Sequence, residues 1–111
     1  MATESNTLGE FEELLLIFLI RNDGAAFGSE VMIAFEDDLK RKVTLQAIFS
    51  SFTRMDEKGL VKSYLIQEPG KRPRRKFMIE SAGRVAVNDA ESKRVESERR
   101  RVRFRNGAAH V

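Results

Sequence analysis

Residues 44–79 read TLQAIFSSFTRMDEKGLVKSYLIQEPGKRPRRKFMI. The first part of this stretch predicts an α-helix over residues 45–58, because five apolar side chains fall on one helical stripe: Leu45, Ile48, Phe49, Phe52 and Met55. Thr44 is the expected N-cap, since its hydroxyl can accept from a free amide of the first turn. Gly59 is suited to end the helix because glycine tolerates a positive φ.

The second part of the stretch predicts a β-hairpin. Residues 60–67 contain β-branched and aromatic side chains typical of a strand, Glu68-Pro69-Gly70 is a turn signal, and residues 77–79 form a second short strand. Five of the six residues that follow the turn are basic: Lys71, Arg72, Arg74, Arg75 and Lys76. Clustered cations repel one another, so a charged hairpin tip that follows DNA phosphates explains them better than a purely structural role. The alternative is a solvated loop.

Two helices are expected before this stretch. Residues 8–21 carry apolar side chains on a wide face, and Asn22-Asp23-Gly24 is a stop signal. A second helix should run from Gly28 to about Lys40, with Ser29 as its N-cap. Three helices followed by a basic hairpin are the layout of a winged helix-turn-helix, so we expect a mainly α fold with a small β-hairpin wing and a long C-terminal helix.

In that architecture the third helix enters the major groove of DNA, and its exposed face should be small and polar. Gln46 is suited to pair with adenine, and Arg54 with guanine or a phosphate. The candidate recognition residues are Thr44, Gln46, Ala47, Ser50, Ser51 and Arg54. An ordinary solvated helix face is the alternative interpretation, since small polar residues are common on protein surfaces.

A last helix is expected over residues 81–105, within the same compact unit as a winged-helix domain formed by residues 1–80. Its apolar residues are too sparse for a stable isolated helix, which favours packing against a second subunit. Val95 and Val102 are seven apart, as in a coiled-coil seam, but Ser92 and Arg99 interrupt that seam. The alternative for the arginine-rich end is a disordered basic tail, and residues 106–111 are expected to be disordered.

Composition narrows the class of function. The 111 residues correspond to one domain; residues 1–40 have a net charge of −7 and residues 41–111 of +10, which favours a polyanionic partner. There is no cysteine, the single histidine is His110, and no apolar run is long enough for a membrane span. We therefore expect a cytoplasmic protein that is neither an enzyme nor a metal protein and that has no cofactor.

Several motifs, in order and with fitting spacings, resemble the PadR-like transcriptional regulators. They are LGEFEELLL at residues 8–16, Phe27-Gly28, RMDEKGLV at residues 54–61, the basic wing, and Ala82-Gly83-Arg84. The resemblance spans residues 8–87 and implies a homodimeric winged-helix repressor that binds palindromic double-stranded DNA. It also implies that residues 44–51 face the operator and that the C-terminal helix mediates dimerisation.

The sequence departs from the PadR-like pattern at four positions. Phe27, Phe49 and Phe77 stand where many members have tyrosine, and Glu80 stands where threonine is common. Some members bind planar aromatic effectors between tryptophans, whereas this chain has no tryptophan; an effector is possible, but the sequence does not identify one. A winged-helix module that binds proteins rather than DNA is the alternative function, and the basic wing argues against it.

Overall fold

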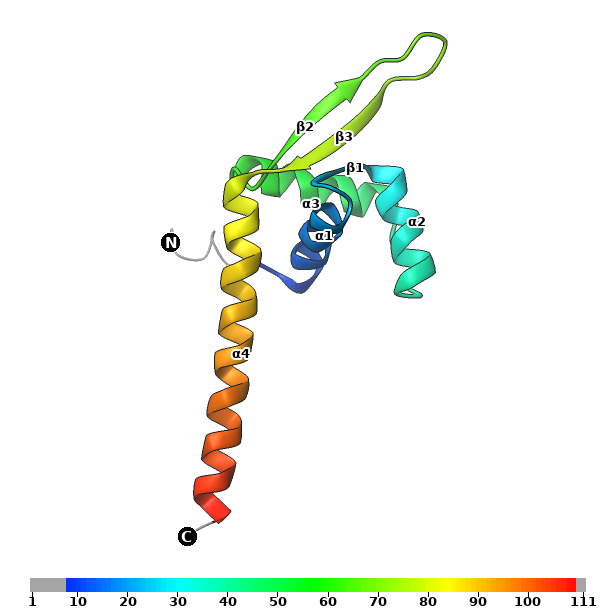
Figure 1. Ribbon diagram of the computed structural model, residues 1–111. Coiled ribbons are helices and arrows are strands. Elements are labelled where there is room, and N and C mark those ends of the chain that lie inside the picture. The colour runs from blue at the N-terminus through cyan, green and yellow to red at the C-terminus, as the bar shows by residue number, and fades with distance from the viewer. Residues whose placement is uncertain (1–7, 110–111) are drawn as a thin grey trace.

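The computed structural model describes residues 8–109, including the side chains of residues 8–102. Three helices come first in Figure 1, α1 (Glu10–Arg21), α2 (Gly28–Asp38) and α3 (Leu45–Glu57), and a short strand β1 (Ala25–Phe27) separates the first two. Strands β2 (Val61–Ile66) and β3 (Arg74–Ile79) follow, and α4 (Ser81–Ala109) projects away from the rest of the molecule. The expected winged-helix fold with a long C-terminal helix is confirmed.

The sheet has three strands, where the sequence predicted a two-stranded hairpin. β3 is central and pairs antiparallel with β1 and β2. The strand β1 was not predicted, because its three residues, Ala-Ala-Phe, show no alternation of apolar and polar side chains. Its pairing with β3 makes up for this weak local preference, since Ala26 lies opposite Phe77 and is fully buried.

The core lies between the helices and one face of the sheet. Phe52 of α3 stacks on Phe77 of β3, with ring centroids 4.2 Å apart and an angle of 15° between the rings. Leu15, Leu16 and Leu19 of α1 are fully buried against the same cluster. The wide apolar face predicted for the first helix therefore packs inside the domain.

The helix ends show which capping predictions were correct. The Thr44 Oγ1 accepts from the Ala47 amide at 3.0 Å, and Gly59 follows α3 with φ of +78°, so both predictions are confirmed. The predicted cap Ser29 is wrong: α2 begins at Gly28 as expected, so Ser29 lies inside the helix, and the N-cap is Phe27, whose amide donates to Glu30 at 2.8 Å. Glu30, at the third position of the helix, accepts from the amide of the cap residue itself, whereas a serine cap would accept from an amide of the first turn.

Other boundaries differ by a few residues. The first helix begins at Glu10 and not at residue 8, and α2 ends at Asp38 and not at Lys40. β3 begins at Arg74, so three of the five wing cations belong to a strand and only Lys71 and Arg72 lie in the turn region. The last helix ends at Ala109, four residues beyond the predicted end, and residues 110–111 lie outside the described part of the chain.

Candidate nucleic-acid interface

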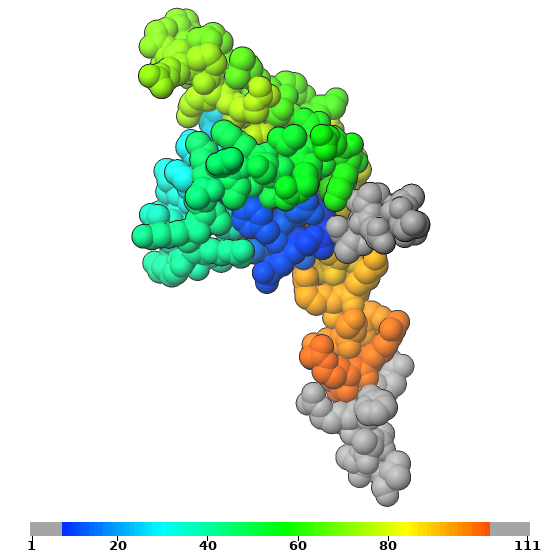
Figure 2. All heavy atoms as spheres, turned by 180° about the vertical axis from the view of Figure 1, so that it is seen from behind, coloured from blue at the N-terminus to red at the C-terminus, as the bar shows by residue number. Residues whose placement is uncertain are grey.

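The exposed side of α3 is the first part of the candidate interface. In Figure 2, α3 crosses the surface between the wing and α1. Ile48, Phe52 and Met55 face the core and are fully buried, whereas Gln46, Ala47 and Ser50 are exposed. The opposite side of the amphipathic helix is therefore open to a partner and carries small, uncharged side chains near its N-terminal end.

Ser51 does not lie on this face. It is only 2% exposed, and its Oγ accepts a hydrogen bond from the Arg54 Nη2 at 3.0 Å. The reason is helical spacing: Ser51 follows Ile48 by three residues and precedes Met55 by four, so it shares their buried side. Its placement among the recognition residues overlooked that spacing.

Arg54 is exposed but turned toward α1. Its Nε lies 3.8 Å from the Glu12 Oε2, and the Lys58 Nζ lies 4.0 Å from the Glu12 Oε1. Glu12 is 8% exposed, so these two cations of α3 balance an almost buried carboxylate. Contact of Arg54 with a guanine or a phosphate stays a prediction, and such contact would have to compete with this ion pair.

Thr53 is a residue of the exposed face that the sequence interpretation missed. A shallow depression on α3 is lined by Leu45, Gln46, Phe49, Ser50 and Thr53. Gln46, Ser50 and Thr53 are spaced by four and then three residues, which is one helical row. That row was visible in the sequence as polar residues out of phase with the apolar stripe. Thr44 borders the row, but its hydroxyl is already used as the cap.

The wing is the second part of the candidate interface. β2 and β3 project beyond the body of the molecule and end in a loop (Figure 1). Lys71, Arg72, Arg74 and Arg75 are exposed, and Lys76 is half-buried. Among the described residues, Arg72 makes no hydrogen bond or ion pair, so its guanidinium is fully available to an anion.

The other wing cations have intramolecular contacts, mostly weak ones. The Lys71 Nζ and the Arg74 Nη2 each lie 3.9 Å from the Glu68 Oε1, and the Arg75 Nη1 donates to the Ser63 Oγ at 3.0 Å. Exposed ion pairs of this length contribute about 0–1 kcal/mol, so a phosphate can displace Glu68 at little cost. The wing can therefore present its positive charge to DNA.

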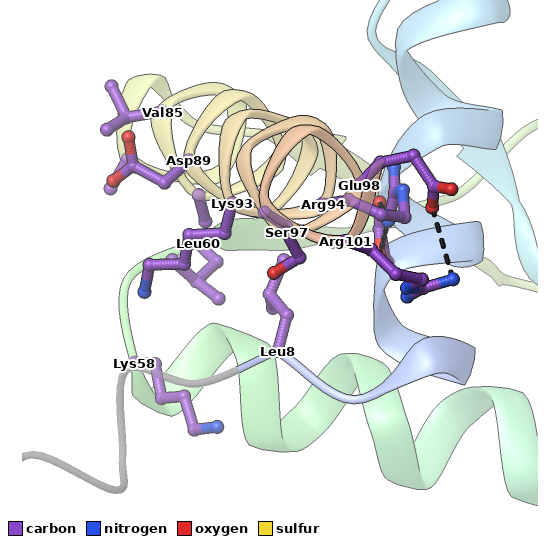
Figure 3. A pocket seen from close by; sticks show the side chains of 14 residues that line it. Leu8, Lys58, Leu60, Val85, Asp89, Lys93, Arg94, Ser97, Glu98 and Arg101 are labelled. Carbon is purple, nitrogen blue, oxygen red and sulfur yellow. Dashed lines mark hydrogen bonds and ion pairs between the residues drawn. The ribbon is translucent and has the colours of Figure 1, made fainter. Parts of the chain in front are cut away.

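The helix α4 forms a separate surface. A groove of about 690 Å³ runs between α4, Leu8 and the end of α3. Figure 3 shows Leu8, Leu60, Val85 and Lys93 around it. Arg94 connects α4 to α1, because its Nη1 donates to both oxygens of the Glu13 carboxylate at 2.9 and 3.1 Å. Beyond this contact α4 continues alone, with Val95 and Val102 nearly half exposed.

Metal-binding clusters and membrane-spanning helices are two further features to consider among the described residues. Within them, no three His, Cys, Asp or Glu side chains are placed to hold a metal ion. No helix of that same part of the chain combines the length and apolar character needed to cross a membrane.

Known proteins are similar to this chain in structure and not detectably in sequence. No protein-family model matches the sequence, and no curated protein is significantly similar to it. A PadR-like transcription factor from Bacteroides fragilis superposes with a TM-score of 0.76 at 14% identity, covering 85% of this chain and 88% of that protein. A transcriptional regulator from Clostridium thermocellum gives 0.67 at 19% identity, with coverages of 84% and 87%.

A third similar structure is Bacillus subtilis PadR in complex with operator DNA. Its TM-score is 0.64 at 13% identity, over 72% of this chain and 45% of that protein. At these identities the likeness establishes the fold. The chain has the winged-helix architecture of the PadR-like regulators, including the helix that follows the wing.

Proposed function

We propose that this protein is a DNA-binding transcriptional regulator, acting as a homodimeric repressor on a palindromic operator. In this proposal α3 enters the major groove and the wing binds phosphates. Its fold is that of proteins described as transcriptional regulators, one of which is in complex with operator DNA. A protein with this role works in the cytoplasm and needs no catalytic group.

One observation carries the proposal: a neutral polar row on α3 lies in the same domain as a projecting, strongly basic hairpin. Gln46, Ser50 and Thr53 can approach base edges because none of them is bulky enough to hold the helix backbone away. The wing cations supply attraction to phosphates that does not depend on sequence. A surface that bound only proteins would not require both features together.

The exposed length of α4 supports the homodimer. Val85, Val95 and Val102 are 56%, 47% and 46% exposed, and the groove beside α4 has apolar walls at Leu8 and Leu60. Packing of the same helix from a second subunit would cover these side chains. A two-fold dimer then presents two α3 helices to half-sites about 34–36 Å apart, or a multiple of that distance.

The direct test is binding to the DNA upstream of the protein's own gene. We expect a discrete shifted band in a gel-shift assay and a footprint with two-fold symmetry, both resistant to an excess of unrelated DNA. Lower transcription from that promoter in the presence of the protein would support repression. Binding that is equally weak on all DNA would contradict the proposal and favour the protein-interaction alternative.

A further inference from the structure

Phe27 occupies a junction between the wing and the helix-turn-helix. It is the last residue of β1 and the residue immediately before α2, where its amide donates to Glu30. In the sheet it lies directly opposite Lys76 of β3. A side chain at this position can therefore act on the wing and on the start of α2 together.

Two of the five wing cations lie over the Phe27 ring. The Arg74 Cζ is 3.7 Å from the ring centroid, and the Lys76 Nζ is 5.3 Å from it. Both distances fall within the range of about 6 Å in which a cation is attracted to the negative face of an aromatic ring. Arg74 is the closer partner, and its planar guanidinium is suited to stack on a ring.

The remaining strand cation, Arg75, lies on the other face of the sheet. Side chains alternate along a strand, so Arg74 and Lys76 share the face that the helices leave open, while Arg75 shares a face with Phe77. Arg75 is held there by the Ser63 hydroxyl at 3.0 Å. The three cations of β3 are thus divided between the two faces of the sheet. The Phe27 ring contacts only Arg74 and Lys76, which share one face.

Holding an arginine in place affects how well it binds. Arginine has one of the largest side-chain entropies, so fixing its position before binding lowers the cost of ordering it on DNA. A guanidinium stacked on a ring keeps its N–H groups at its edge, where they can donate to a phosphate. The ring orders Arg74 without occupying those donors.

We propose that Phe27 is a positioning residue for DNA binding, which holds Arg74, and more weakly Lys76, ready for phosphate contact on the face of β3 that the Phe27 ring covers. The proposal rests on the proposed function, because it specifies how that DNA surface is organised. Phe27 itself does not contact the DNA.

The test compares Phe27→Leu, which removes the ring and keeps an apolar side chain, with Phe27→Tyr, which keeps the ring. Operator affinity is measured by fluorescence anisotropy at several salt concentrations. We expect Phe27→Leu to weaken binding about two- to tenfold per homodimer, on operator and unrelated DNA alike, and Phe27→Tyr to bind as wild type does. The dependence of log K on log salt should stay close to that of wild type, because no cation is removed.

A double-mutant cycle separates positioning from general stability. In an Arg74→Gln background, Phe27→Leu should have little further effect, because the residue that it positions is gone. An equal loss of affinity in both backgrounds would overturn the proposal, as would wild-type affinity in Phe27→Leu. Thermal unfolding of every variant shows whether the fold is retained.

A measurement on the free protein, without DNA, distinguishes a failure of this positioning role from a failure of the proposed function. In the free protein the ring should shift the NMR signals of the Arg74 δ-protons upfield, and Phe27→Leu should abolish that shift. Loss of the shift with no change in affinity would overturn the positioning role. Failure of the wild-type protein to bind any DNA would overturn the proposed function itself.

Discussion

Arg94 in α4 and Glu13 in α1 are joined by two hydrogen bonds from one nitrogen, the Arg94 Nη1, at 2.9 and 3.1 Å. The adjacent residue, Glu12, faces Arg54 and Lys58 of α3. Two consecutive carboxylates of α1 therefore connect the C-terminal helix and the candidate recognition helix. This turn of α1 therefore contributes to the orientation of α4 relative to α3.

We predict that Arg94→Gln lowers the free energy of unfolding by about 0.5–1 kcal/mol, a value typical of an ion pair in which one partner is exposed to solvent. Glu13→Gln should cost a similar amount. The double variant should cost less than the sum of the two, since either substitution alone breaks the interaction. Urea unfolding measures all three, and strictly additive losses would show that the pair contributes nothing in solution.

Removal of the stacked ring in the core should be far more costly. Phe52→Ala is expected to lose about 3–5 kcal/mol of unfolding free energy, because it leaves a cavity against Phe77. Phe52→Leu should lose less, since it fills part of that space. Thermal unfolding followed by circular dichroism is the measurement, and a Phe52→Ala variant as stable as wild type would contradict the packing described.

Substitutions on α3 should alter base preference. Gln46→Ala or Ser50→Ala is expected to cost about 1–3 kcal/mol of binding energy at one or two base positions and to leave the salt dependence unchanged. Ser51→Ala is the matched control, because it also removes a serine hydroxyl, but from the buried side of the helix. Affinities on a panel of single-base operator variants provide the measurement. Altered base preference in Ser51→Ala alone would mean that another face of α3 meets the DNA.

Neutralising the wing should weaken binding to every DNA sequence alike. For the combined Arg72, Arg74 and Arg75→Gln variant, the slope of log K against log salt should flatten by about 0.9 for each phosphate that a subunit no longer binds. If the wing variant keeps wild-type affinity at both low and high salt, the wing does not bind phosphates.

The assembly can be tested without DNA. We expect sedimentation equilibrium to give a dimer at micromolar concentration, and Val95→Asp with Val102→Asp to give a monomer, because charges at these exposed positions would be buried in the pair. A stable monomer in the wild-type protein would contradict the two-fold arrangement.

The helices and their ends were largely predictable, because the information is local. The stripe in α3, the Thr44 cap and the glycine after α3 each depend on residues within a few positions of one another. The strand β1 was not predictable from the sequence. Ala25 pairs with Met78, 53 positions later, and no local pattern in residues 25–27 indicates that pairing. The split of the wing cations has the same cause, since it depends on the register and the alternation of β3.

The candidate site was predictable as a region and less so in its details. Charge clustering identified the wing, and the amphipathic stripe identified the exposed side of α3. Ser51 was misplaced although its spacing from Ile48 and Met55 puts it on the buried side, and Thr53 was missed although it continues the exposed row of Gln46 and Ser50. The contacts of Arg54 with Glu12 and of Arg74 with Phe27 join distant parts of the chain, and no local pattern encodes them.

The late position of β3 in the chain has a consequence for biosynthesis. Phe77 and Ile79 complete the core, so a nascent chain that contains only the first three helices lacks the ring that stacks on Phe52 and the strand that pairs with β1 at Ala26. Proteins are made from the N-terminus, and exposed apolar surface on an incomplete chain promotes aggregation. Apolar side chains of α1 and α3 therefore stay accessible to chaperones until residue 79 has left the ribosome, and a premature stop before β3 would yield a fragment that cannot close its core.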